Sequence, residues 1–266
     1  MSPLLHIQSV SKSFGGLRAV DHCSFEVAEN SITGLIGPNG AGKTTMFDVI
    51  SGLLKPTAGK IIFKHEEISS LPFHVRARRG IVRTFQNIRL FPQLTALENI
   101  MVAFPDYPDR CVDMFRPLAT HCAALKKRAH DLLALTKLHD MANHEARSLS
   151  YGQQKLVEIL RCVATGATLL LLDEPTAGVN RTMLHHIVDL IKHLQKEGKT
   201  ILLVEHDMNF VMNLCERIVV MDFGTDIAHG TPHEIQQNPR VMEAYLGSVK
   251  KAHHAPIPHH TSSTSR

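Results

Sequence analysis

Residues 37–45 of the chain read Gly37-Pro38-Asn39-Gly40-Ala41-Gly42-Lys43-Thr44-Thr45, which is a glycine, four residues and then Gly-Lys-Thr. This spacing is typical of a phosphate-binding loop. The apolar residues 32–36 before it predict a buried strand, and residues 44–51 after it predict a helix that stops at Gly52. A strand, a glycine-rich turn and a helix in this order are the context in which the pattern binds phosphate.

Each part of this loop has a physical role in binding a polyphosphate. Glycine lets the backbone turn tightly, so that its amide N–H groups point at phosphate oxygens, and the following helix N-terminus adds positive potential. Lys43 supplies a full charge to the outer phosphates, and the Thr44 hydroxyl is a ligand for Mg²⁺. We therefore expect a nucleoside triphosphate and Mg²⁺ to bind here.

A second element is a run of four leucines that ends in two acids, Leu169-Leu170-Leu171-Leu172-Asp173-Glu174. The run is too short to span a membrane and predicts a buried strand. Because ligands lie at the carboxyl ends of such strands, we expect Asp173 to hold Mg²⁺, directly or through water. We expect Glu174 to orient or deprotonate an attacking water. The alternative is an ordinary strand before a polar turn, and the presence of Lys43 in the same chain argues against it.

A third element, Leu149-Ser150-Tyr151-Gly152-Gln153-Gln154, resembles the Leu-Ser-Gly-Gly-Gln signature of ATP-binding cassette (ABC) ATPases. Ser150 and Gln153 also predict a capping box that opens a helix, and a helix start offers a hydroxyl and free N–H groups to an anion. Three further residues occur in the order of that family. Phe14 resembles the aromatic that stacks on adenine, Gln86 resembles the Q-loop glutamine, and His206 resembles the switch histidine.

The resemblance covers roughly residues 4–247 and implies a fold. It implies an α/β P-loop NTPase, an ABC cassette with a RecA-like core, an antiparallel β subdomain and an inserted helical subdomain at about residues 92–165. The cassette would occupy residues 1–247. Residues 248–266 are rich in His, Ser and Thr, which predicts a disordered tail.

The same resemblance implies roles for individual residues. Nucleotide would be bound by Phe14, Gly37, Pro38, Asn39, Gly40, Ala41, Gly42, Lys43, Thr44, Thr45, Ser150, Gly152 and Gln153. Catalysis would use Lys43, Gln86, Glu174 and His206, and Mg²⁺ would lie near Thr44, Gln86 and Asp173. Two ATP molecules would be clamped between two cassettes, each joining the Lys43 loop of one subunit to the Ser150 helix of the other.

Two stretches depart from the general pattern of the family. Tyr151 stands where the signature commonly has glycine, and Ala177-Gly178-Val179-Asn180 stands where Ser-Ala-Leu-Asp is common. The Leu-Ser-Tyr-Gly-Gln form and the ending Ala244-Tyr245-Leu246-Gly247 look like the ATPase subunits of branched-chain amino acid importers. Importers of urea or short-chain amides are the nearest alternative.

Composition and motif content bound the remaining alternatives. The 266 residues carry a net charge of +4 and no apolar run near the roughly 20 residues of a membrane span. A soluble ABC ATPase of DNA repair or translation usually has paired cassettes, coiled-coil arms or zinc modules, and none is visible. A P-loop kinase or GTPase would have no use for Ser150-Tyr151-Gly152.

These observations imply partners and a location. We expect an identical or sister ABC ATPase subunit, two transmembrane permease subunits and an extracytoplasmic substrate-binding protein, and no nucleic acid. No secretory signal is visible at the N-terminus. The protein is expected as a peripheral subunit on the cytoplasmic face of the inner membrane.

Overall fold

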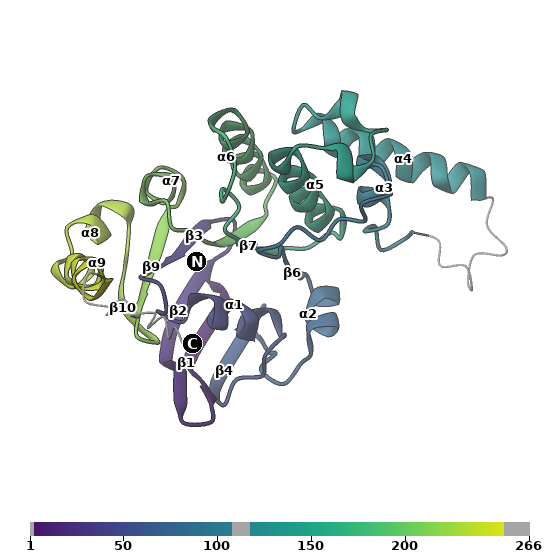
Figure 1. The fold of residues 1–266 in the computed structure, drawn as a ribbon. Helices are drawn as coiled ribbons and strands as arrows, with labels where there is room; N and C mark the ends of the chain where they lie inside the picture. The colour runs from purple at the N-terminus through teal and green to yellow at the C-terminus, as the bar shows by residue number, and fades with distance from the viewer. Residues whose placement is uncertain (1–2, 108–117, 253–266) are drawn as a thin grey trace, which may run out of the picture.

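The computed structural model describes the backbone of residues 3–107 and 118–252, and these residues form two β-sheets with helices around them (Figure 1). The larger sheet has the strand order β10-β9-β3-β8-β7-β6. Its strands are β3 (Ile32–Ile36), β6 (Ile81–Arg83), β7 (Leu169–Asp173), β8 (Thr200–Val204), β9 (Arg217–Asp222) and β10 (Thr225–Gly230). The smaller antiparallel sheet has the order β2-β1-β4-β5, from β1 (Pro3–Phe14), β2 (Leu17–Ala28), β4 (Ala58–Phe63) and β5 (Glu66–Glu67).

The centre of the larger sheet is parallel and buried on both faces. All residues of β3, β7 and β8 are buried, which is why these strands are continuous apolar runs rather than alternating ones. β8 pairs in parallel with β3 on one side and β7 on the other. The carboxyl ends of these three strands therefore lie side by side at one edge of the sheet.

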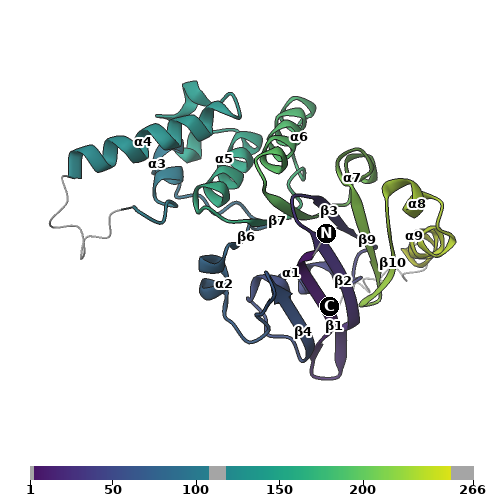
Figure 2. The same cartoon turned by 180° about the vertical axis from the view of Figure 1, so that it is seen from behind.

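Two hydrophobic cores cover the two faces of this sheet. Leu172 of β7 packs in the core formed with α3 (Ala96–Met101), α4 (Leu118–Ala134), α5 (Tyr151–Ala164), α6 (Arg181–Lys196) and α7 (Met208–Leu214). Leu171 packs in the other core, with the antiparallel sheet and α1 (Lys43–Ser51). Neighbouring leucines reach opposite cores because strand side chains alternate in direction. Figure 2 shows the same layers from behind, with α3, α4 and α5 grouped at one end. The predicted α/β class is confirmed.

The capping box predicted at Ser150 is confirmed, and three other helices start with a side-chain cap as well. Thr95, Ser150 and Thr231 each close a capping box at the start of α3, α5 and α8 (Pro232–Gln236). Asn180 caps α6 by accepting a hydrogen bond from the Met183 amide at 3.0 Å. These caps are local, because the side chain and the amide it binds are three residues apart.

The inserted helical subdomain is expected at about residues 92–165. This region contains α3, α4 and α5, with the short helices η1 (His139–Met141) and η2 (Ala146–Ser148) between α4 and α5. Residues 108–117 of the region lie outside the described residues.

The end of the cassette differs from the expectation. The helix α9 (Pro239–Ala252) continues past residue 247, where we placed the end of the cassette. Apolar Val241, Tyr245 and Val249 recur every four residues and carry the helical pattern across that boundary. The predicted tail from 253 onward lies outside the described residues.

A buried arginine holds the end of α1 in place. Arg76, on α2 (Phe73–Arg79), is 0% exposed and donates to the last carbonyls of α1, at Val49 (2.7 Å) and Ile50 (2.8 Å). It also donates to the carbonyls of Leu71 (2.9 Å) and Ser69 (3.0 Å). Burial lowers the pKa of Arg76 to about 10. The guanidinium satisfies carbonyls that a helix C-terminus leaves unpaired, and so fixes the helix that carries Lys43.

We expect Arg76→Ala to lower the free energy of unfolding by about 3–5 kcal/mol, because four carbonyls lose a charged donor in a dry site. Urea denaturation monitored by circular dichroism measures this change. Arg78→Ala, on the exposed face of the same helix, is the control and should stay within about 0.5 kcal/mol of the wild type. Equal stability of the two variants would contradict the role given to Arg76.

Candidate functional site

The glycine-rich loop leaves the end of β3 and enters α1 at Lys43. Gly40 and Gly42 have φ of 82° and 96°, in the left-handed region that favours glycine. At Gly37 a Cβ would lie 2.0 Å from the carbonyl oxygen of Met221, so only glycine fits there. The Lys43 ammonium donates to the carbonyls of Gly37 (2.7 Å) and Pro38 (2.9 Å). The loop therefore surrounds the Lys43 ammonium with its own backbone carbonyls.

An open cavity of about 410 Å³ lies over this loop, within the usual size range of small-molecule sites. It is lined by Leu17, Arg18, Ala19, Asn39, Gly40, Ala41, Gly42, Lys43, Thr44, Thr45, Glu174, His206, Phe223 and Gly224. Burial lowers the pKa of Lys43, and the charges of Glu174 and Asp173 oppose that shift. The cavity combines a lysine, backbone amides and a helix N-terminus, which together attract a polyanion.

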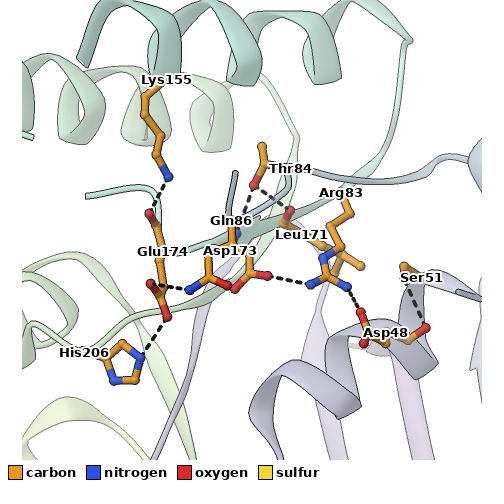
Figure 3. A network of polar contacts seen from close by, with 10 residues as sticks. All are labelled: Asp48, Ser51, Arg83, Thr84, Gln86, Lys155, Leu171, Asp173, Glu174 and His206. Carbon is orange, nitrogen blue, oxygen red and sulfur yellow. Dashed lines mark hydrogen bonds and ion pairs between the residues drawn. The ribbon is translucent and has the colours of Figure 1, made fainter. Parts of the chain in front are cut away.

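Glu174 lies where the neighbouring parallel strands end and binds two of the predicted catalytic side chains (Figure 3). His206, beyond β8, places Nε2 at 2.9 Å from Glu174 Oε1, and Gln86, beyond β6, donates from Nε2 to Oε2 at 3.4 Å. Glu174 has φ of 47°, a left-handed conformation that costs a non-glycine residue about 1–3 kcal/mol. The structure therefore brings together Gln86, Glu174 and His206, three of the four residues proposed for catalysis from the sequence.

Asp173 is held by a buried ion-pair network (Figure 3). Arg83, at the end of β6, donates from Nη2 to Asp173 Oδ2 at 2.5 Å and from Nη1 to Asp48 on α1. The Arg83 and Asp173 side chains are only 5% and 4% exposed. Thr84 Oγ1 accepts a hydrogen bond from the Asp173 amide at 3.0 Å. The network links α1, β6 and β7 to one another.

Other predicted residues lie apart from this cavity. Phe14 is at the end of β1, is 46% exposed and does not line it. Ser150, Gly152 and Gln153 are at the N-terminus of α5, also outside the lining. A Cβ on Gly152 would lie 2.7 Å from Met183 Cγ on α6. Close packing against α6 therefore requires glycine at position 152.

Sequence reasoning missed several residues of the site. Arg83 was not among the predicted site residues, because nothing in its neighbouring sequence reveals that it is buried between two carboxylates. The turn at Asp222-Phe223-Gly224 joins β9 to β10 and brings Phe223 to the cavity. No local signal marks such a contact, because the turn and the glycine-rich loop are far apart along the chain.

The sequence matches two described protein families. Residues 20–177 match the family described as ABC transporter, and residues 227–251 match the family described as branched-chain amino acid ATP-binding cassette transporter. The chain is 43% identical to the high-affinity branched-chain amino acid transport ATP-binding protein BraF of Pseudomonas aeruginosa. That match covers 93% of this chain and 99% of BraF.

Solved structures of similar proteins share the fold. The ADP conformation of MJ1267, an ATP-binding cassette of an ABC transporter, superimposes with a TM-score of 0.80 at 31% identity, covering 93% of this chain and all of that one. A dimeric post-hydrolysis state of the cassette MJ0796, bound to ADP and Pi, has a TM-score of 0.73 at 28% identity, covering 86% and 98%. No helix in residues 3–107 and 118–252 is both long and apolar enough to cross a membrane.

We expect Arg83→Met to lower the free energy of unfolding by about 3–5 kcal/mol, because Asp173 becomes a buried charge without a partner. Urea denaturation without nucleotide and with EDTA measures this cost. Adding Asp173→Asn should recover part of the lost stability, since it removes the uncompensated charge. Arg79→Met, which breaks the exposed pair with Glu66, is the control and should cost no more than about 1 kcal/mol. A double variant less stable than Arg83→Met alone would contradict the network.

Proposed function

This chain belongs to the ABC transporter family of ATP-binding cassettes, and from that premise we propose that it hydrolyses ATP to power an importer of branched-chain amino acids. The observation that carries the proposal is the placement of Glu174 and His206 in the same cavity as the glycine-rich loop. A phosphate-binding loop alone serves many NTPases. A carboxylate aimed into the same cavity and paired with a histidine supplies the means to activate water there.

We infer that the loop binds the phosphates of ATP. Its amides and the N-terminus of α1 provide donors, and Lys43 provides the charge. In this structure Lys43 donates to loop carbonyls, so binding requires the ammonium to exchange those partners for phosphate oxygens. The exposed apolar Leu17 and Phe223 line the same cavity, and Phe14 remains the proposed adenine contact from the sequence.

Glu174 is the proposed base for the attacking water. Its two carboxylate oxygens face Gln86 and His206, which orient the group and leave it able to accept a proton. Thr44, Gln86 and Asp173 offer hydroxyl, amide and carboxylate oxygens, the donor types that Mg²⁺ prefers. When bound with ATP, Mg²⁺ would neutralise part of the phosphate charge. The rest of the catalytic contribution of this chain is to hold the phosphates and the attacking water in place.

The proposed complete site needs a second cassette. Ser150, Gly152 and Gln153 do not line the cavity of their own chain, although the Ser150 cap places a hydroxyl at the start of a helix, where an anion is stabilised. We infer that this helix start contacts the ATP held by a partner cassette, identical or sister. The dimeric state of MJ0796 with ADP and Pi supports such an arrangement.

The proposed transporter has further subunits. A cassette that drives import needs two transmembrane permeases and an extracytoplasmic substrate-binding protein, and it would lie on the cytoplasmic face of the inner membrane. Branched-chain amino acids are the proposed cargo for two reasons. Residues 227–251 match a family described as a branched-chain amino acid transporter, and BraF, which is 43% identical to this chain, is described as a branched-chain amino acid transport protein. An importer of urea or short-chain amides is the alternative with the same ATPase role.

Glu174→Gln should bind ATP but lower its hydrolysis by about 100-fold or more, since the amide keeps the shape and cannot accept a proton. Phosphate release measures hydrolysis, and gel filtration with ATP and Mg²⁺ measures the closed dimer that should accumulate when the partner cassette is present. Glu197→Gln, at an exposed position beyond α6, is the control. Wild-type turnover by the Glu174 variant would exclude Glu174 as the base.

Cells that lack this chain should lose high-affinity uptake of labelled leucine, isoleucine and valine and keep their uptake of urea. Transport should return with the wild-type chain and not with Glu174→Gln, because the cargo moves only when ATP is hydrolysed. Lost urea uptake with normal amino acid uptake would favour the alternative cargo.

A further inference from the structure

Lys155 is a buried lysine on α5 that binds the backbone of Glu174. Lys155 directly follows the signature stretch 149–154, and the residue is 2% exposed. Nζ donates to the carbonyl oxygen of Glu174 at 2.8 Å (Figure 3). Burial lowers the pKa of Lys155, opposed by the charges of Glu158, Glu205, Glu174 and Asp173. A buried charge is costly unless it is hydrogen-bonded, and the Glu174 carbonyl supplies such a bond to the Lys155 ammonium.

The carbonyl that Lys155 binds belongs to a strained residue. Glu174 is in the left-handed region at φ of 47°, a conformation that persists only where its surroundings hold it. Its amide donates to the Val204 carbonyl at 3.0 Å, and its carbonyl accepts from the Ala177 amide at 3.2 Å as well as from Lys155. The backbone is thus fixed on both sides, and its direction decides where the carboxylate points.

The signature residues lie at the N-terminus of the same helix, in the turn before Lys155. Ser150 caps α5 and Tyr151 is its first residue. Lys155 Nζ lies 5.8 Å from the centre of the Tyr151 ring, and this ring packs so closely on Gly178 that a Cβ there would lie 3.1 Å from Tyr151 Cε1. One rigid helix therefore contacts both the segment that follows Glu174 and Glu174 itself.

We propose that Lys155 is a positioning residue that sets the backbone of Glu174 and couples it to the signature helix. The proposal rests on the function proposed above, in which Glu174 is the base and the start of α5 meets the ATP of the partner cassette. A shift of α5 on meeting that ATP then moves the Lys155 ammonium, and with it the carbonyl of Glu174. The two ATP sites are coupled through one helix and one hydrogen bond.

A purely structural role is the competing explanation, because Lys155 also neutralises buried acids such as Glu205, which is 3% exposed. Lys199 is a control for a lysine that is removed from solvent and bound to a backbone carbonyl elsewhere in the fold. It too donates from a part-buried position to a backbone carbonyl, that of Ala167 at 2.7 Å, and burial lowers its pKa as well. Ala167 and Lys199 do not line the cavity, so Lys199 shares the chemistry of Lys155 without contact to Glu174.

The experiment compares Lys155→Met, Lys155→Gln, Lys155→Arg and Lys199→Met in the full-length chain, each assayed with the partner cassette present. Binding of a fluorescent ATP analogue gives Kd, phosphate release gives kcat and KM, and thermal unfolding shows which variants are folded. We expect Lys155→Met and Lys155→Gln to lower kcat by about tenfold or more with Kd and KM within about threefold, the pattern of a lost transition-state interaction. Lys155→Arg should restore most of kcat, because it keeps a charged donor.

Lys199→Met should keep wild-type kcat whatever its stability. If every folded variant that lacks the lysine at 155 also keeps wild-type kcat, Lys155 is only structural and the proposal is overturned. The proposal would also be overturned if Lys199→Met lost as much kcat as the Lys155 variants and if the losses in all variants followed their loss of thermal stability. Absence of hydrolysis by the wild-type chain would instead count against the proposed function, so the two failures are distinguishable.

Discussion

The parallel pairing of β3, β8 and β7 is the constraint on which the site depends. Because β8 lies between the other two in register, the glycine-rich loop, His206 and the two acids leave the sheet at the same edge. Buried residues along all three strands hold that register, since a shift of one residue would turn each side chain to the opposite core. The chemistry of the site is thus positioned by strands that carry no reactive group themselves.

Charged side chains are buried at this edge of the sheet, and the two neighbouring acids, Asp173 and Glu174, are each bound by a different basic residue. Asp173 is held by Arg83, which also pairs with Asp48 on α1. Glu174 is held through its backbone by Lys155 on α5. The two neighbouring acids are therefore fixed from opposite sides of the sheet. Such contacts add little net stability, and their value is in direction, because a carboxylate held in one orientation needs no reorganisation when ATP arrives.

The division of the molecule into two cores separates the two halves of the proposed site. The glycine-rich loop belongs to the core formed with the antiparallel sheet, and the signature helix belongs to the core of helices on the other face. The signature residues consequently lie outside the cavity that the loop forms. α5 is the element that connects these halves, since it begins at Ser150 and contacts Glu174 through Lys155.

The sequence by itself determined the fold class, the family and the helix starts, because these depend on patterns confined to a few neighbouring residues. The glycine spacing, the leucine run and the Ser150 and Thr95 capping boxes are of this kind. Only the tertiary structure decided which charges meet. Arg83 and Asp173 are 90 positions apart, and Lys155 and Glu174 are 19 apart. Hydrophobic periodicity indicates that a position is buried, but the partner of a buried charge depends on how strands and helices from distant parts of the chain come together.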